Sequence, residues 1–234
     1  MMMSSSGRRR ILIAAATDAE LACLADAIGS GRRLRHRLVE HIVNGREVHL
    51  LATGVGMVAT ASWCSRALAE SQYDLAVNIG LCGSFDESLV PGTVVHVVSD
   101  CLAELGAEDG DRFLTLHQLG LEDRADASLG GVAFVNDQPP AIAALARLPK
   151  VRGITVNTVH GNEPSIVAVV ERLGPQVESM EGAAFMYACL MHQVPLAQIR
   201  AVSNVVERRN RPAWKVREAI DALSRVVLDV VNGS

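Results

Sequence analysis

The sequence has little of what marks several large classes of protein. Aromatic residues make up 3% of its 234 residues, and acidic residues outnumber basic ones by 26 to 22. The resulting formal net charge of −4 gives no electrostatic reason to expect a nucleic-acid partner. No apolar run approaches the ~20 residues that a membrane-spanning helix needs, so membrane insertion is not expected either.

The cysteine pattern of a secreted or zinc-binding domain is also missing. The five cysteines are odd in number and none stands in C-x-x-C spacing, so neither a disulfide framework nor a zinc site is indicated. Basic residues precede an apolar run near the N-terminus, but only residues 11–16 are apolar before Asp18, which is too short for a secretory signal. We therefore expect a cytoplasmic protein without a metal.

What is present is the composition of one large globular domain. Hydrophobic residues make up 49% of the chain and charged residues 21%, and a chain of this length buries a full core. We expect residues 1–10 to form a disordered tail and residues 11–232 to form a single domain.

The hydrophobic pattern predicts strands and helices in alternation. Apolar residues recur at helical spacing in 18–28, and Asn44-Gly45 predicts a type I′ hairpin turn because this pair tolerates positive φ angles. We expect strands over 11–16, 37–43, 46–53, 75–80, 92–100, 151–157, 176–180 and 196–203, and helices over 18–28, 57–70, 140–147, 163–173, 181–192 and 212–231. Residues 100–139 read as irregular. This order predicts an α/β fold with a largely parallel sheet and helices on both faces.

The residues that follow the predicted strands are the candidates for a site, because ligands of open α/β sheets bind beyond the carboxyl ends of the strands. They are polar, rich in glycine and poor in metal ligands, and they comprise Thr17, Asp18, Glu20, 53–56, 80–84, 180–182, Ser203 and Asn204. Glu20 and Glu181 also fit as inert carboxylates at helix starts, and Asn204 fits as a turn or cap. The pattern alone leaves both interpretations open.

Residues 54–59 formally match the G-x-G-x-x-A fingerprint of dinucleotide-binding proteins. That motif belongs to a βαβ unit with an acidic residue at the end of its second strand. Here a hairpin precedes the motif, and Asp74 lies before the next strand. We therefore interpret the glycines as allowing close backbone approach, expect no cofactor, and keep a dinucleotide-binding oxidoreductase as a remote alternative.

Five segments together resemble the purine nucleoside phosphorylase/nucleosidase superfamily over roughly residues 11–231. In order they read "ATDAELACL", "LLATGVGMVATA", "VNIGLCGSF", "VESMEGAAF" and "IRAVSNVVERRN". Within the superfamily, "GSFDESLVPGTVVHVVSD", "LGAEDGDRF", "SMEGAAF" and "SNVVERRN" look most like the futalosine hydrolase family of menaquinone biosynthesis. The resemblance implies a three-layer αβα sandwich with a mixed central β-sheet and no metal or cofactor. It also implies a homo-oligomer, dimeric or dimer-based, whose neighbouring subunit helps to line the site.

The resemblance also implies roles for particular residues. Glu181, next to Met180, matches a carboxylate that binds the ribose hydroxyls. Its electrostatic stabilisation of the sugar increases as the ribose becomes oxocarbenium-like. Glu20 matches the glutamate that orients and deprotonates the attacking water. The other substrate-binding residues that the match implies are Met180, Gly54, Val55, Cys82, Gly83 and Phe85. Phe85 and Phe185 are candidates for stacking on the base, although both also suit the core.

Departures from the superfamily pattern favour one reaction and one base. Asn78 stands where phosphorylases of the superfamily carry a phosphate-binding arginine, so hydrolysis is favoured over phosphorolysis. Asn204 stands where thio-nucleosidases carry an aspartate; its N–H can donate to a 6-oxo group, whereas a 6-aminopurine would oppose donor to donor. An unpaired buried polar group costs ~1–3 kcal/mol, so a 6-oxopurine is preferred. Leu81 replaces a serine of the thio-nucleosidases, so the way the water is held is not predicted.

These inferences predict an N-glycosyl hydrolase that releases hypoxanthine from futalosine or a related 6-oxopurine nucleoside. Glu20 activates water, Glu181 binds the ribose and Asn204 stabilises the leaving base. The alternatives within enzymes are a methylthioadenosine/S-adenosylhomocysteine-type nucleosidase and a purine nucleoside phosphorylase. From another class, the chain could be a non-catalytic nucleoside-binding homologue, although such a binder has less need of Glu20.

Overall fold

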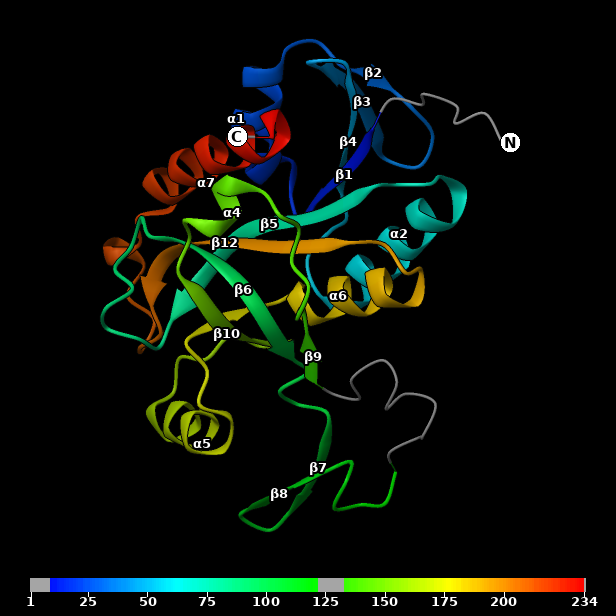
Figure 1. The fold of residues 1–234 in the computed structure, drawn as a ribbon. Coiled ribbons are helices and arrows are strands. Elements are labelled where there is room, and N and C mark those ends of the chain that lie inside the picture. The colour runs from blue at the N-terminus through cyan, green and yellow to red at the C-terminus, as the bar shows by residue number, and fades with distance from the viewer. Residues whose placement is uncertain (1–8, 122–132, 234) are drawn as a thin grey trace.

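Strands occupy the centre of the structure, a computed structural model that describes residues 9–121 and 133–233 (Figure 1). Ten of the described strands form one sheet in the order β11-β10-β6-β12-β5-β1-β4-β3-β2, with β9 paired to β6. They are β1 (Arg10–Ala15), β2 (Arg32–Arg33), β3 (Leu38–Val43), β4 (Arg46–Ala52), β5 (Leu75–Ser84), β6 (Val94–Cys101), β9 (Ala133–Val135), β10 (Lys150–Thr155), β11 (Val177–Ser179) and β12 (Leu196–Val205). A separate hairpin joins β7 (Gly106–Asp109) to β8 (Arg112–Thr115).

The sheet is mixed, as the family resemblance implied and the strand alternation did not. β5 runs parallel to β1 and β12 but antiparallel to β11. β6 runs antiparallel to β12. The change of strand direction arises between β5 and β6, because no helix lies between them in the sequence. A parallel return to the same sheet would need a long crossover connection.

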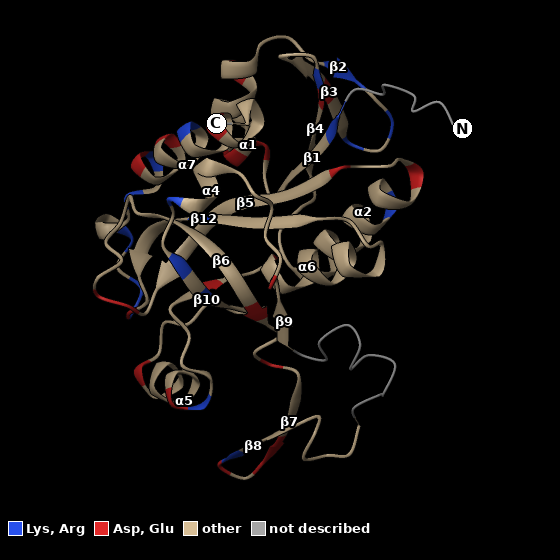
Figure 2. Cartoon of the chain, in the orientation of Figure 1, with Lys and Arg blue, Asp and Glu red and all other residues tan. Residues whose placement is uncertain are grey.

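Helices cover both faces of this sheet (Figure 1). They are α1 (Asp18–Ile28), α2 (Met57–Glu70), α4 (Ala143–Ala146), α5 (Glu163–Leu173), α6 (Gly182–Met191) and α7 (Val216–Asn232). Side chains alternate along β1, so Ile13 packs with α1 and α7 while Leu12 packs with α2 and α6. α6 carries no charged residue, as the uncoloured ribbon in Figure 2 shows, and seven of its residues are buried. The result is a three-layer αβα sandwich.

Local sequence signals located several elements well. The predicted helices over 18–28, 57–70 and 163–173 have the bounds of α1, α2 and α5. Asn44 and Gly45 have φ angles of 49° and 78°, which confirms the predicted turn between β3 and β4. The first helical turn of α1 is closed by a capping box between Thr17 and Glu20.

Other predictions were wrong. The stretch expected to be irregular holds β7, β8 and β9, and the helix expected over 140–147 has the four residues of α4. The last helix begins at Val216, because Pro212 lies in a separate 3-10 turn, Arg211–Ala213. Most of the expected tail lies outside the described residues, but Arg10, which was assigned to it, is the first residue of β1. Within the described ranges, none of the helices has both the length and the apolar character that a membrane span requires.

Candidate active site

A cavity of about 320 Å³ opens where β1, β5, β11 and β12 end. Glutamates and small residues from segments far apart in the sequence surround it. The described residues that line it are Ala16, Thr17, Ala19, Glu20, Val55, Leu81, Cys82, Gly83, Val159, Glu178, Ser179, Met180, Glu181, Ser203, Asn204, Trp214, Val216 and Ile220. The structure therefore brings Glu20, Glu181 and Asn204 to one cavity.

Glu20 is held at the cavity wall by hydrogen bonds to both of its carboxylate oxygens. Its Oε2 accepts from the backbone N–H of Thr17 at 3.0 Å and from the Thr17 hydroxyl at 2.9 Å. Its Oε1 accepts from the backbone N–H of Leu81 at 3.2 Å. Glu20 thus both closes the first turn of α1 and lines the cavity. Leu81, which stands where the thio-nucleosidases carry a serine, contributes its backbone N–H to the orientation of Glu20.

Glu181 lies at the N-cap of α6 and is 7% exposed. Its Oε1 accepts from the backbone N–H of Gly56 at 3.1 Å. Gly56 is in turn the N-cap residue of α2, so the carboxylate lies near the positive end of a helix dipole. A second carboxylate is therefore fixed in the same cavity by a backbone donor.

A buried network lies behind Glu181 and anchors the start of α6. The Thr155 hydroxyl accepts from the backbone N–H of Ala183 at 2.7 Å and donates to Asp100 at 2.9 Å. Gln198 Nε2 donates to the other oxygen of Asp100 at 2.9 Å, while no described residue forms a hydrogen bond with Gln198 Oε1. Burial raises the pKa of Asp100 to about 6. This support for Glu181 is thus built on a carboxyl group that burial favours in its neutral form.

Asn204 contacts its chain neighbours and faces the cavity. Its Oδ1 accepts from the Ser203 hydroxyl at 2.7 Å, and its Nδ2 donates to the Val205 carbonyl at 2.9 Å. An amide nitrogen carries two hydrogens, so a second N–H is available for a ligand. This arrangement suits a donor to a purine oxygen.

Glu178 and His160, which the sequence did not single out, form a polar pair at the same end as Asn204. Glu178 is 4% exposed, and its Oε2 lies 2.6 Å from His160 Nδ1. Its Oε1 accepts from the backbone N–H of His160 at 3.1 Å. Burial raises the pKa of Glu178, and the hydrogen bonds from His160 oppose that rise. Both residues line a second, smaller cavity that also includes Gly83 and Asn204.

A buried cation lies behind Glu20. Arg200 is 1% exposed, and its Nη2 donates to Asn78 Oδ1. Asn78 Nδ2 donates to the Ala14 carbonyl at 2.9 Å, so Asn78 is turned away from the cavity. A Cβ atom placed on Gly80 would lie 2.9 Å from Glu20 Oε1 and would also meet Arg200 Nη1. Gly80 thus leaves room for both the guanidinium and the carboxylate. A charged residue inside the otherwise uncharged strand segment "LAQIRAVS" is the signal that could have found it.

The remaining predicted residues divide into two groups. Met180, Val55, Cys82 and Gly83 line the cavity, whereas Gly54 and Phe85 do not. Gly54, with φ of 95°, shapes the turn that carries Val55.

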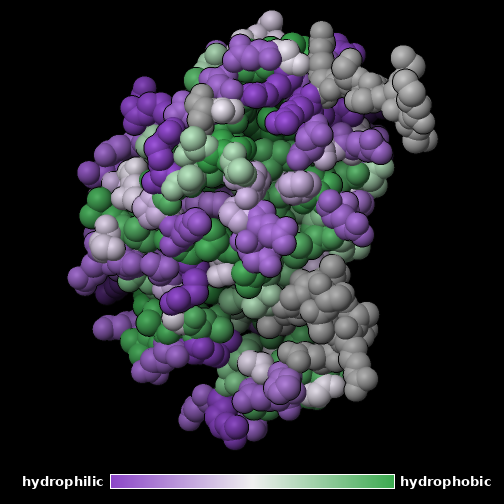
Figure 3. Space-filling view, in the orientation of Figure 1, coloured by the Kyte–Doolittle hydropathy of each residue, from purple (hydrophilic) through white to green (hydrophobic). Residues whose placement is uncertain are grey.

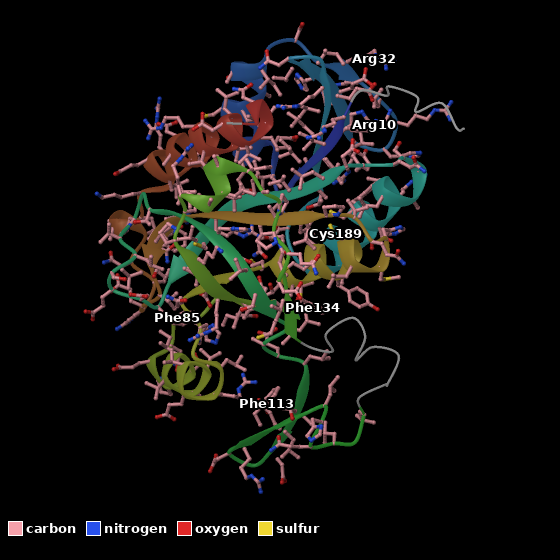
Figure 4. The ribbon with its side chains drawn as sticks, in the orientation of Figure 1. Arg10, Arg32, Phe85, Phe113, Phe134 and Cys189 are labelled. Carbon is pink, nitrogen blue, oxygen red and sulfur yellow. The ribbon has the colours of Figure 1, made fainter. Side chains whose placement is uncertain are left out.

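The aromatic residue at the cavity is not one that the sequence indicated. Phe85 packs beside His160, with ring centroids 6.0 Å apart, and lies between β10 and α5 in Figure 4. Phe185 is fully buried in the core. Trp214 lines both cavities, and its place follows from the 3-10 turn before α7 rather than from a motif.

One cluster elsewhere has the spacing of metal ligands. Glu40, Glu47 and His49 place their ligand atoms within 4.8 Å of one another. Arg32 and Arg10, labelled in Figure 4 far from Phe85, already pair with the two carboxylates at 2.7 Å and 2.6 Å. The cluster thus has internal charge partners and lies apart from the cavity residues.

Comparisons with known proteins match most of the length of the chain. The family model described as Phosphorylase superfamily matches residues 10–232. A futalosine hydrolase of Streptomyces coelicolor is 35% identical over 189 residues, which cover 76% of each chain. A structure of Helicobacter pylori futalosine hydrolase superposes with a TM-score of 0.81 at 13% identity, covering 96% of this chain and 97% of that one. A 5′-methylthioadenosine/S-adenosylhomocysteine nucleosidase of Colwellia psychrerythraea, complexed with adenine, gives 0.80 at 21% identity, covering 97% and 96%. At these identities the two solved structures show the fold.

Proposed function

Since the chain belongs to the phosphorylase superfamily, as its five segments indicated, we propose that it is an N-glycosyl hydrolase that releases hypoxanthine from futalosine. The observation that carries the proposal is the convergence of Glu20, Glu181 and Asn204 on one cavity. The similarity to a curated futalosine hydrolase supports the substrate. The cytoplasm is the proposed location.

In the proposed reaction Glu20 acts as the general base. Its carboxylate takes a proton from water as the water oxygen attacks the anomeric carbon. Thr17 and Leu81 hold the two carboxylate oxygens, so the base does not have to be reoriented during the reaction. Among the described residues that line the cavity there is no Arg or Lys, which supports water over phosphate as the nucleophile.

Glu181 binds the ribose hydroxyls and stabilises the positive charge that builds on the sugar. A carboxylate held by a backbone N–H is acceptor-only on its remaining lone pairs, which suits hydroxyl donors. The electrostatic gain is larger in a cavity that excludes water than in bulk solvent. Asn204 donates an N–H to O6 of the base, which selects a 6-oxopurine over a 6-aminopurine.

We also propose that a second copy of the chain covers the mouth of the cavity. Val55 is 58% exposed and Val58, at the start of α2, is 81% exposed. Val159 and Val216 add further exposed apolar groups at the cavity lining. On the face seen in Figure 3, hydrophobic residues are interspersed with hydrophilic ones. Light scattering on the purified protein tests the proposal, and a monomer at micromolar concentration contradicts it.

One assay tests the activity. Purified protein is incubated with futalosine, inosine and methylthioadenosine, with and without phosphate, and the released base is identified. We expect hypoxanthine from futalosine at a rate that phosphate does not change. Acceleration by phosphate would indicate a phosphorylase, and adenine from methylthioadenosine would indicate the thio-nucleosidase alternative.

A further inference from the structure

Three residues lie in one row across the sheet at the base end of the cavity. Gly83 of β5 is the register partner of Glu178 in β11 and of Asn204 in β12. Side chains of paired residues project from the same face of a sheet. A Cβ atom built on Gly83 would lie 2.8 Å from Val206 Cγ2, 3.4 Å from Asn204 Nδ2 and 3.5 Å from Glu178 Cγ. Because Gly83 has no side chain, the amide and the carboxyl group are neighbours on either side of it.

Departure of a purine requires a proton that Asn204 cannot supply. When the bond from C1′ to N9 breaks, its electron pair stays on the base, and protonation at N7 makes that base neutral. A carboxamide has no proton to transfer at neutral pH, although it can donate a hydrogen bond. The substitution of amide for acid at position 204 thus leaves the proton to another group.

The Glu178–His160 pair can supply the proton that Asn204 cannot. Glu178 Oε2 and His160 Nδ1 lie 2.6 Å apart, the distance of a short hydrogen bond between a carboxyl group and an imidazole. Glu178 lines the main cavity, and His160 lines the adjoining one. Phe85 packs against the edge of His160 and helps to fix the imidazole. Burial, which raises the pKa of Glu178, favours a held proton.

We propose that Glu178, positioned by His160, donates the proton to N7 of the leaving purine while Asn204 donates its N–H to O6. N7 and O6 lie side by side on one edge of a 6-oxopurine and are both acceptors. Two neighbouring donors match that edge, whereas adenine presents an amino group next to N7 and would oppose Asn204. This inference rests on the proposed function and names the acid of that reaction.

The proton balance of the step is complete. The C1′–N9 electron pair remains on the purine, and the proton between Glu178 and His160 moves to N7. The water oxygen bonds to C1′, and its proton moves to Glu20. Solvent then takes the proton from Glu20 and returns one to the pair, so the enzyme ends in its starting state.

The test compares leaving groups that need a proton with one that does not. Futalosine methylated at N7 carries a positive ring that departs as a neutral base without protonation. We expect Glu178→Gln to lower kcat on futalosine ~10²-fold and to leave kcat on the N7-methyl nucleoside within about threefold of the wild type. His160→Gln should show the same selectivity with a smaller loss. Turnover of the methylated nucleoside also shows that each variant is folded.

Glu181→Gln is the matched control, because it removes a carboxylate that acts on the sugar and should slow both substrates. A second probe, 4-nitrophenyl β-D-ribofuranoside, releases a stable anion and should behave like the methylated nucleoside. Equal losses of Glu178→Gln on both classes of leaving group, or an unchanged rate on futalosine, would overturn the assignment. If the wild type leaves futalosine intact, the proposed function itself fails, which is a separate result.

Discussion

The two ends of the cavity hold their polar side chains in different ways. At the proposed sugar end, backbone N–H groups of Thr17, Leu81 and Gly56 bind Glu20 and Glu181, and the Thr17 hydroxyl adds one further hydrogen bond. At the proposed base end, backbone contacts are joined by the side-chain pairs Glu178 with His160 and Ser203 with Asn204. Backbone amides donate but do not exchange their protons during a reaction, so they favour fixed negative charge, whereas side-chain pairs can pass a proton on. In the proposed reaction, this difference separates charge stabilisation from proton transfer within one cavity.

The largest effect on activity is expected from substituting Glu20 at the proposed sugar end of the cavity. Glu20→Gln removes the proposed base, so kcat should fall ~10³-fold, within the range typical of a lost general base. Hypoxanthine release under saturating substrate measures it. Asp18→Asn is the matched control, because Asp18 is an exposed carboxylate in the same first turn of α1 and does not line the cavity. A Glu20→Gln enzyme that retains a tenth of the activity or more would contradict the assignment.

Asp100, in the buried network behind Glu181, should make the stability of the protein depend on pH. The pKa of Asp100 is about 6 in the folded protein against its usual 3.8, so between these values the folded state holds a proton that the unfolded chain has released. The contribution of Asp100 to stability is therefore complete below pH 3.8 and is lost as pH rises through 6.

Asp100→Asn keeps the shape and removes this titration. Urea unfolding of both proteins from pH 4 to pH 6 should show the difference in unfolding free energy shifting in favour of the variant, by about 2 kcal/mol. His96, whose pKa burial lowers to about 4, has the opposite slope in this window, but it is present in both proteins and cancels. A difference that stays constant with pH would contradict the raised pKa of Asp100.

A glycine-to-alanine substitution can be made at each end of the cavity, at Gly80 near Glu20 and at Gly83 near Asn204, both in β5. In Gly80→Ala the new Cβ would lie 2.9 Å from Glu20 Oε1, so the carboxylate should move and kcat should fall ~10²-fold. In Gly83→Ala the Cβ would lie 2.8 Å from Val206 Cγ2 and within 3.4 Å of Asn204 Nδ2, so it should chiefly raise KM. Steady-state kinetics on futalosine separate the two outcomes. If the two variants changed kcat and KM in the same way, the two ends of the cavity would not act independently.

Local signals in the sequence reach more of the proposed sugar end than of the proposed base end. Glu20 and Glu181 lie at strand-to-helix junctions, which local apolar periodicity locates, and the family resemblance implied their roles. Glu178 reaches the site only through the pairing of β11 with β5, which is a contact between residues distant in sequence. Arg200 likewise lies inside a strand whose neighbours are not set by local signals. Register across a sheet depends on tertiary packing, so the Gly83 row could not be predicted from the chain alone.

The smallest effect, and the one most specific to the base end, is expected from Asn204→Asp. A carboxylate at this position accepts from the 6-amino group of adenine, whereas it repels the O6 oxygen of hypoxanthine. Exchanging one such hydrogen bond is worth ~1–3 kcal/mol, so the ratio of kcat/KM for methylthioadenosine to that for futalosine should rise at least about tenfold. Ser203→Ala is the companion variant, since it removes the hydroxyl that orients the amide without changing the donor at 204. If the ratio stays the same in Asn204→Asp, base choice is made elsewhere in the cavity, and Glu178, across Gly83, becomes the residue to test for it.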